Sequence, residues 1–286
     1  GIGSLNKKVL KKLNNKFTNK KINRFYYLRK KLKSKNLYTF FDFIKANKNS
    51  KKAAKFLNLL KNKKNNKILF TCHSFADAAH FSGINFVFND YYDQLKQTIK
   101  FVSEYDKTNI WIFRSHPNSR FLNEYHIFVD LIRKYKTKNI LVCPKNIPIK
   151  KLINICDVLV TGRGTTGLEF ACEGKKVILA GSAPYSNFDI AHQAKTKKEY
   201  FNFIKNINNK INLNNNKKLL ARKLMYIFEN GLTVKKIMDQ EYEKDFYISR
   251  YFKQIYQPSF SYNELLHTSY NFLKNGVKKS LFFKKL

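Results

Sequence analysis

Between residues 67 and 205, short apolar runs alternate with longer amphipathic segments, and this alternation constrains the fold most strongly. The apolar runs are ILFTC, IWIFR, NILVC, DVLVT and KVILAG, at 68–72, 110–114, 139–143, 157–161 and 176–181. Continuous apolar runs of this length predict strands that are covered on both faces. Helix-like segments occupy 90–105, 121–135, 149–156, 165–174 and 196–207. The alternation therefore predicts an α/β fold, a Rossmann-like parallel sheet with helices on both faces.

The flanking segments differ in composition from this central region. Residues 1–66 are rich in Lys and Asn, with helix-like apolar spacing at 37–44 and 53–60 and no strand signal. After an Asn-rich stretch, the chain returns to helical spacing in KLLARKLMYIFENG and continues with aromatic-rich segments. We therefore expect a basic helical or linker segment at 1–66, a Rossmann-like nucleotide-binding domain at 67–210 and a helical C-terminal extension at 211–286.

The chain carries 56 Lys and Arg against 19 Asp and Glu, a formal net charge of +37. Lys is abundant together with Asn, Ile, Phe and Tyr, the composition expected of an A/T-rich genome, and no nucleic-acid-binding motif accompanies the charge. We therefore expect no specific nucleic-acid partner. A charge this high still favours anionic lipid, nucleotides or acidic glycans.

The four cysteines, Cys72, Cys143, Cys156 and Cys172, lie in or beside apolar runs and show no C-x-x-C spacing. They predict buried free thiols in a reducing, cytoplasmic compartment and no metal site. No apolar run approaches the roughly 18 residues of a membrane-spanning helix.

The loops that follow the predicted strands differ from those that precede them. In order they are CHSFADAAH, RSHPNSR, CPKNIP, TGRGTTGLE and GSAPYSNFD, all polar, Gly/Pro-marked or His-bearing, whereas the opposite ends are plain Lys/Asn turns. Ligands of open parallel sheets bind beyond the carboxyl ends of the strands. The asymmetry predicts one ligand-binding edge, with Tyr185 and Ser186 of the last loop as candidate binding residues.

The loop after the fourth strand contains Gly162, Gly164 and Gly167 in G-x-G-x-x-G spacing. We predict that Thr165 or Thr166 caps the following helix, and that the free N–H groups at the helix start favour a phosphate. The loop does not fit an NAD-binding fingerprint, because it follows the fourth strand and no acidic residue stands about 20 positions further on. A glycine turn that binds nothing is the alternative.

Glu169 lies one helical turn beyond these threonines, where its carboxylate could accept the hydroxyls of a ribose. Arg163 stands within the glycine loop and is a further candidate binding residue. For Glu169, an ordinary exposed helix acid is the alternative.

The second loop places Arg114, His116 and Pro117 directly after an apolar strand. The residue before a proline is held extended, which predicts an imidazole fixed at the edge of the sheet. His116 could donate to a phosphate and stabilise a departing nucleotide, and Arg114 could bind a phosphate bidentately. A purely structural turn is the alternative.

The first loop carries His73, Asp77 and His80, which are candidates for the same site. An Asp–His contact there could tune a proton carrier. Two histidines and an aspartate could also hold a metal, but no helical register supports that reading, and we expect none.

In this order, HSFADAAH, WIFRSHPNSR and TGRGTTGLEFACEGKKVILAGSAPYSNFD resemble the capsule polysaccharide biosynthesis group of GT-B glycosyltransferases, which includes bacterial Kdo transferases that use a CMP-activated sugar. The resemblance covers about residues 67–205, matching the nucleotide-sugar-binding C-terminal half. The His-Pro and Thr-rich pair also resembles motifs of bacterial GT-B sialyltransferases. It implies that His116 contacts the donor phosphate, that Gly164, Thr165 and Thr166 cradle it, and that Glu169 holds the ribose. The remaining candidates with less defined roles are Arg114, Arg163, His73, Asp77 and His80.

The resemblance implies a metal-independent transferase without a cofactor, whose donor is a nucleotide-sugar, CMP-linked in preference to UDP-linked. A glycan or glycolipid acceptor in capsule or O-antigen biosynthesis, an anionic inner-membrane surface and polysaccharide export proteins would be its partners. We expect a cytoplasmic protein peripherally associated with the inner membrane. A GT-B enzyme has a second Rossmann domain that often carries the general base, and 1–66 are too short and polar to form one.

Two alternatives stay open. One is another enzyme with this fold, a UDP-sugar 2-epimerase or a teichoic-acid-type glycerophosphotransferase. The other is a non-catalytic domain that binds nucleotide or glycan in polysaccharide export.

Overall fold

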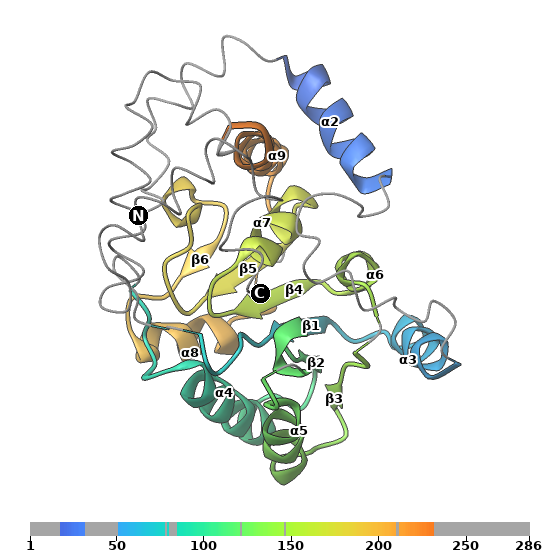
Figure 1. The fold of residues 1–286 in the computed structure, drawn as a ribbon, viewed down its shortest axis with the longest axis vertical. Helices are drawn as coiled ribbons and strands as arrows, with labels where there is room; N and C mark the ends of the chain where they lie inside the picture. The colour runs from blue at the N-terminus through green and yellow to red at the C-terminus, as the bar shows by residue number, and fades with distance from the viewer. Residues whose placement is uncertain are drawn as a thin grey trace, which may run out of the picture. The chain divides into compact units, whose positions relative to one another are not determined.

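Figure 1 shows the fold in a computed structural model. The structure describes residues 18–31, 51–77, 79, 85–120, 122–145, 147–209 and 212–231. The chain divides into two compact units, Gly1–Tyr226 and Ile227–Leu286, and nearly all described residues belong to the first. The predicted domain boundaries after residues 66 and 210 stay predictions.

A six-stranded, fully parallel sheet forms the centre of the first unit, which confirms the predicted α/β, Rossmann-like fold. The strands are β1 (Lys67–Thr71), β2 (Ile110–Arg114), β3 (Ile140–Val142), β4 (Val158–Thr161), β5 (Lys176–Leu179) and β6 (His192–Gln193). Five of them match the predicted runs to within two residues. The sixth was not predicted, because two polar residues carry no strand signal.

The strand order is β3-β2-β1-β4-β5-β6. The chain therefore builds outward from β1 to one side, crosses back, and builds outward from β4 to the other. The two central strands pair in parallel, with Thr71 opposite Thr161 at their carboxyl ends. The order thus reverses between β1 and β4, the point at which open α/β sheets bind ligands.

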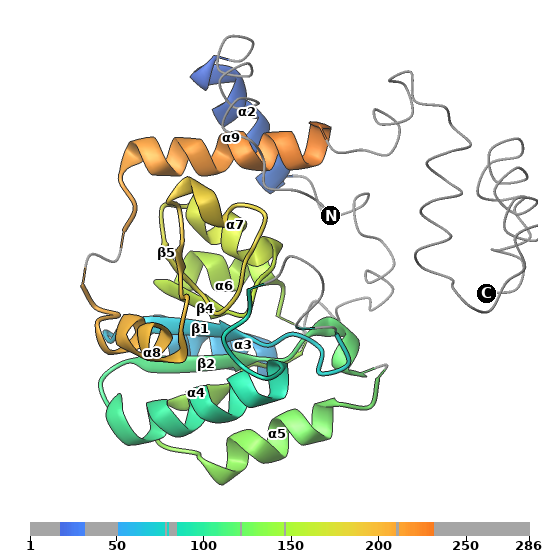
Figure 2. The ribbon, with the colours of Figure 1, turned by 90° about the vertical axis from the view of Figure 1, so that its left-hand side faces the viewer.

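Helices cover both faces of the sheet, as Figure 2 shows. On one side lie α4 (Tyr91–Tyr105) and α5 (Tyr125–Lys134), and on the other α6 (Ile149–Ile155) and α7 (Thr165–Cys172). The helix α8 (Lys197–Lys205) packs beside α4, where the Tyr200 and Thr98 hydroxyls are 2.9 Å apart. Strand residues are fully buried between these layers, including Leu69, Ile112 and Leu159.

Local signals fix several helix starts. Asp90 caps α4 by accepting from the Asp93 N–H at 2.6 Å, and Thr196 caps α8 by accepting from the Glu199 N–H at 3.1 Å. We expected a helix from residue 121, but α5 begins at Tyr125. Asn123 has a φ of 53°, which is incompatible with a right-handed helix.

Of the helices in the described part of the chain, three lie outside the strand–helix alternation: α2 (Asn19–Lys31), α3 (Lys51–Lys61) and α9 (Asn215–Gly231). The last two confirm the predicted helices near 53–60 and 218–231. The helix expected at 37–44 and the tail beyond residue 231 lie outside the described residues. All four cysteines are free and buried, as predicted, and burial raises their thiol pKa values.

Candidate functional site

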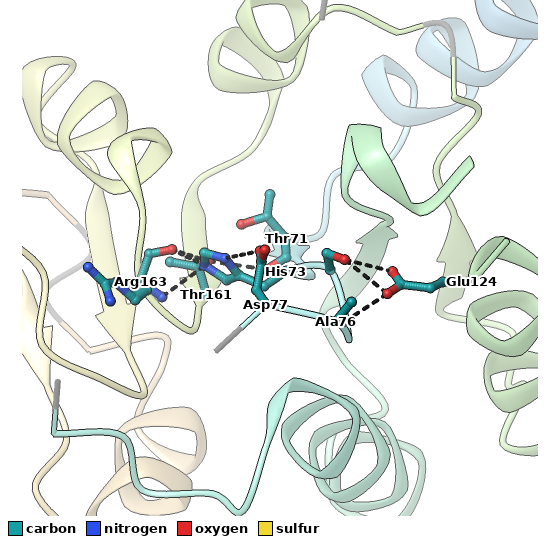
Figure 3. Close-up of polar contacts among 8 residues, drawn as sticks. Thr71, His73, Ala76, Asp77, Glu124, Thr161 and Arg163 are labelled. Carbon is teal, nitrogen blue, oxygen red and sulfur yellow. Dashed lines mark hydrogen bonds and ion pairs between the residues drawn. The ribbon is translucent and has the colours of Figure 1, made fainter. Parts of the chain in front are cut away.

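Two loops meet where the strand order reverses, at the carboxyl edge of the sheet. The first, residues 72–77, follows β1, and the second, residues 162–164, follows β4. Figure 3 shows them side by side. The Thr161 hydroxyl donates to the Thr71 carbonyl at 3.1 Å, which joins the two strand ends directly beneath the loops.

His73 connects the two loops. Its Nε2 accepts from the Arg163 N–H at 3.2 Å and also contacts the Arg163 carbonyl oxygen, so the loop backbone engages this nitrogen in either neutral tautomer. The ring stacks on Tyr91 with centroids 4.5 Å apart, and Nδ1 lies 4.0 Å from Asp77. Burial lowers the pKa of His73 to about 4, although the Arg163 backbone contact opposes the shift. His73 is therefore neutral at pH 7 and holds the glycine loop in place.

A buried carboxylate holds the first loop in place. Glu124 accepts from the Ser74 hydroxyl at 2.9 Å and from the Ala76 N–H at 2.8 Å (Figure 3). Glu124 is only 6% exposed, so these bonds replace water at a charged group. We did not predict this role from the sequence. The available signal was an acid at the start of an apolar helix, which usually caps the helix itself, but the Glu124 side chain makes no cap hydrogen bond with α5.

The His-Pro segment reaches the same edge. The His116 ring lies 6.2 Å from the His73 ring, nearly parallel to it at 12°, and Pro117 begins a short 3-10 helix, Pro117–Arg120. Burial lowers the pKa of His116, while Asp77 and Glu124 oppose the shift. His116 is therefore neutral at pH 7 and can donate through one ring nitrogen.

Arg114 stands at the end of β2, but its guanidinium donates to the Ile147 carbonyl at 2.5 Å. It ties the strand end to the loop after β3. The bidentate phosphate contact that we expected of Arg114 would have to share or break this bond, so the structure favours a structural role for it.

The glycine loop depends on its lack of side chains. A methyl on Gly162 would lie 2.9 Å from Tyr91 Cε1 and 3.1 Å from the His73 ring. Gly164 has a φ of 134°, which other residues rarely adopt, and it occupies the N-cap position of α7. The prediction that Thr165 or Thr166 caps this helix is therefore wrong, because both are already helical.

Tyr185 lies beneath the loop. Its side chain is 1% exposed, and its hydroxyl donates to the Gly164 carbonyl at 2.5 Å. The hydroxyl sits over Gly167, where a methyl would come within 3.0 Å of Tyr185 Cζ. We predicted Tyr185 as a ligand-binding residue, but its burial corrects this to support of the loop. The Ser186 hydroxyl accepts from the Ala183 N–H at 2.8 Å within its own turn, and its contact with a ligand stays a prediction.

Donors for an anion gather at the first turn of α7. Among the described residues, none accepts from the N–H groups of Thr165 and Thr166, which stand at the positive end of the helix. The Arg163 guanidinium points away from His73 in Figure 3 and has no ion pair with any described residue. Glu169, one turn further, accepts from Arg29 of α2 at 2.9 Å.

The structure thus brings together the predicted residues of the first, second and fourth loops. Those that gather are His73, Asp77, His116, Pro117, Gly162, Arg163, Gly164, Thr165 and Thr166. His80 lies outside the described residues. No group of three or more His, Cys, Asp or Glu side chains within the described ranges is arranged to hold a metal ion. In the same ranges, no helix combines the length and apolar character needed to cross a bilayer.

A family model described as "Capsule polysaccharide biosynthesis protein" matches residues 7–249. No curated protein sequence matches the chain.

Several solved structures are similar to parts of the chain at low sequence identity. The β-Kdo 2,7-transferase KpsC of Thermosulfurimonas dismutans is 15% identical, with 60% of this chain and 50% of that chain covered and a TM-score of 0.36. A glycosyltransferase from Rickettsia africae ESF-5 is 17% identical, with 82% and 55% covered and a TM-score of 0.36. The UDP-GlcNAc 2-epimerase of Methanocaldococcus jannaschii is 15% identical, with 63% and 50% covered and a TM-score of 0.40. The chain spans about half the length of these proteins.

Proposed function

The chain belongs to the capsule polysaccharide biosynthesis protein family, and on that premise we propose that it is a glycosyltransferase that moves a sugar from a nucleotide-sugar donor to a growing surface polysaccharide or lipid-linked glycan. One observation supports the donor site above all others. The His73 loop and the glycine loop meet at the reversal of strand order, beside the N-terminus of α7.

The donor phosphate would lie at that N-terminus. The Thr165 and Thr166 N–H groups have no acceptor among the described residues and would bind its oxygens. The Arg163 guanidinium would add a charge-assisted hydrogen bond. Donors placed in advance where negative charge develops on the leaving nucleotide lower the barrier to sugar transfer.

His116 would complete the phosphate site from the β2 side. Because burial keeps it neutral before the donor binds, it would donate one hydrogen bond, and a phosphate nearby would favour its protonated form. These cationic and dipolar groups would supply the stabilisation that a metal ion provides in other transferases. Glu169, which pairs with Arg29 in this structure, would accept hydrogen bonds from the ribose hydroxyls.

The donor class and the acceptor are finer proposals. A CMP-linked sugar such as Kdo is preferred over a UDP-linked one because the motifs resemble those of the Kdo and sialic acid transferases. The acceptor would be a lipid-linked glycan at the inner membrane surface, in contact with polysaccharide biosynthesis or export proteins.

Calorimetric titration with CMP, CDP and UDP tests the donor site. We expect at least one nucleotide to bind, and Arg163→Gln, His116→Ala and Glu169→Ala each to weaken that binding about tenfold or more, since each removes a hydrogen bond that involves a charged group. Unchanged affinity in all three variants would refute the site.

Two control variants match these changes. His126→Ala removes an exposed histidine of α5 and should leave affinity unchanged. Glu173→Ala removes the other carboxylate that holds α2, through Lys30 at 2.7 Å, without touching the proposed ribose site. If Glu173→Ala weakened binding as much as Glu169→Ala, the effect of Glu169 would come from α2 and not from the ribose. Incubation with a free UDP-sugar and no acceptor then separates the transferase from a 2-epimerase, which alone would form a product.

A further inference from the structure

All charged residues of the helix α2 are basic. Its sequence NKKINRFYYLRKK has Lys or Arg at positions 20, 21, 24, 29, 30 and 31 and no acidic residue. Residues three and four apart share a face of a helix. Each face of α2 carries cations together with large apolar residues, but the two faces have different surroundings.

The inner face of α2 is fixed to the domain. Ile22 and Tyr26 are buried, and the Tyr26 hydroxyl donates to Glu173 of α7 at 2.8 Å. Arg29 and Lys30 pair with Glu169 and Glu173 at 2.9 and 2.7 Å.

The helix α9 holds the same face from a second direction. Phe25 packs edge-on against Tyr226 with centroids 4.8 Å apart, and Arg222 donates to Asn23 at 2.7 Å. Figure 2 shows α2 crossing α9, and in Figure 1, where α9 is seen end-on, α2 lies beside it. This packing leaves the opposite side of α2 facing outward.

The outer face combines cations with exposed apolar side chains. Lys20, Lys21 and Arg24 are exposed, and one turn further Tyr27 and Leu28 are 55% and 49% exposed. Positions 20, 24, 27 and 28 follow the spacing of a single helical face. Exposed apolar side chains that are grouped on a surface often mark an interaction site. The same arrangement stabilises a helix that lies in a bilayer interface, with its apolar groups below the headgroups and its cations among them.

We propose that the outer face of α2, formed by Lys20, Lys21, Arg24, Tyr27 and Leu28, binds the interface of an anionic lipid bilayer. This proposal rests on the proposed function and specifies the surface that meets the membrane. Lipid fits the face better than nucleic acid, because an exposed leucine has a place among acyl chains and none on a phosphate backbone. Since α2 packs on α7, whose first turn is the proposed donor site, docking would hold that site close to a lipid-linked acceptor.

The test must separate this face from the general attraction of a +37 chain to any anionic surface. The double variant Tyr27→Ser/Leu28→Ser removes the apolar pair and leaves every charge unchanged. The matched control is Tyr105→Ser/Leu122→Ser, which removes a tyrosine and a leucine that are 66% and 48% exposed elsewhere on the domain. Binding of the full chain is measured by co-sedimentation with phosphatidylglycerol/phosphatidylcholine vesicles and with phosphatidylcholine vesicles alone, at physiological salt.

We expect the α2 variant to lose about tenfold in affinity for the anionic vesicles, because the partition free energy scales with buried apolar area, and the control to bind like the unmodified chain. Equal losses in both variants, or none in either, would overturn the proposal. Binding of unrelated oligonucleotides that falls with the α2 variant, without a matching loss on vesicles, would assign the face to nucleic acid and also overturn it.

A fluorescence experiment measures insertion directly. The only tryptophan, Trp111, is fully buried, so a tryptophan introduced at position 27 or 105 reports on its own surroundings. Tyr27→Trp should shift its emission to the blue and be quenched by brominated lipid, whereas Tyr105→Trp should not. Absence of quenching at position 27 would refute insertion. Nucleotide titration of the same variants keeps the two proposals apart, since the donor site is expected to bind nucleotide whether or not α2 meets a membrane.

Discussion

The close packing of Tyr185 against Gly167 gives a quantitative test of the site's architecture. A methyl at position 167 would come within 3.0 Å of Tyr185 Cζ and closer still to the hydroxyl that bonds the Gly164 carbonyl. Overpacking a close contact costs about 1–3 kcal/mol, and loss of the hydrogen bond adds about 1 kcal/mol. Replacing a helical glycine with alanine returns about 1 kcal/mol of helix propensity. We therefore expect Gly167→Ala to lower the free energy of unfolding by about 2 kcal/mol.

A double-mutant cycle with Tyr185→Phe identifies the cause. Tyr185→Phe alone should cost about 1 kcal/mol, because the Gly164 carbonyl loses its donor. In the double variant the hydrogen bond is lost only once and the obstructing oxygen is absent, so the total loss should fall short of the sum of the single losses by about 2 kcal/mol. Denaturant unfolding followed by the emission of the single buried tryptophan, Trp111, provides the free energies.

The matched control pairs Gly167→Ala with Tyr200→Phe. Tyr200 is also fully buried and loses a comparable hydrogen bond, to Thr98 at 2.9 Å, but it packs between α8 and α4. These two changes should add within about 0.5 kcal/mol. Additivity of Gly167→Ala with Tyr185→Phe would refute the placement of Tyr185 beneath the glycine loop.

Two further predictions concern the first loop. Because burial lowers the pKa of His73 from 6.5 to about 4, the unfolded chain binds more protons between these values, and stability is lost as the pH falls from about 6.5 to 4. The loss of stability amounts to about 3 kcal/mol at 1.36 kcal/mol per pH unit. Denaturant unfolding at pH 7 and pH 4.5 should show most of this loss in the unmodified chain and in the exposed-residue control His126→Gln, and a smaller loss in His73→Gln. An unchanged pH dependence in His73→Gln would contradict the assignment. Glu124→Gln should cost about 1–2 kcal/mol, because the Ser74 hydroxyl loses its 3.0 Å bond to the second carboxylate oxygen and the Ala76 N–H loses a charged acceptor. It should also speed hydrogen exchange of the 73–77 amides, whereas Glu104→Gln, which changes an exposed acid, should do neither. Unaltered exchange in Glu124→Gln would show that the carboxylate does not hold the loop.

The sheet could be predicted from sequence because its strands are buried on both faces. A run such as IWIFR is apolar at every position, and its neighbours in the sheet have the same character, so pattern and packing agree. β6 could not be predicted, since His192 and Gln193 join the sheet through backbone bonds to β5 and not through apolar side chains. The start of α5 was misplaced for a similar reason, because the backbone at Asn123 and not the apolar spacing decides it.

The candidate site, like the fold, could be predicted from the sequence only in part. Sequence reasoning placed the polar loops on one edge of the sheet, since parallel strands bring all their carboxyl ends together. It could not tell which side chains face a ligand and which face the protein. Tyr185 and Arg114 are directed into the structure by partners distant in the sequence, Gly164 and Ile147, and Glu124 was missed because its partners precede it by about 50 residues.

The three glycines that first suggest a phosphate loop each have a reason inside the protein. Gly162 makes room for Tyr91 and His73, Gly164 adopts a positive φ, and Gly167 makes room for Tyr185. The same spacing would be needed in a domain that binds nothing, so a glycine variant that lost nucleotide affinity would not show that phosphate binds there. Arg163→Gln is the more informative change, because the backbone of Arg163 bonds His73 while its guanidinium has no ion pair among the described residues. It should leave folding intact and weaken only the binding of an anion, so its effect on affinity tests the loop's chemistry separately from its packing.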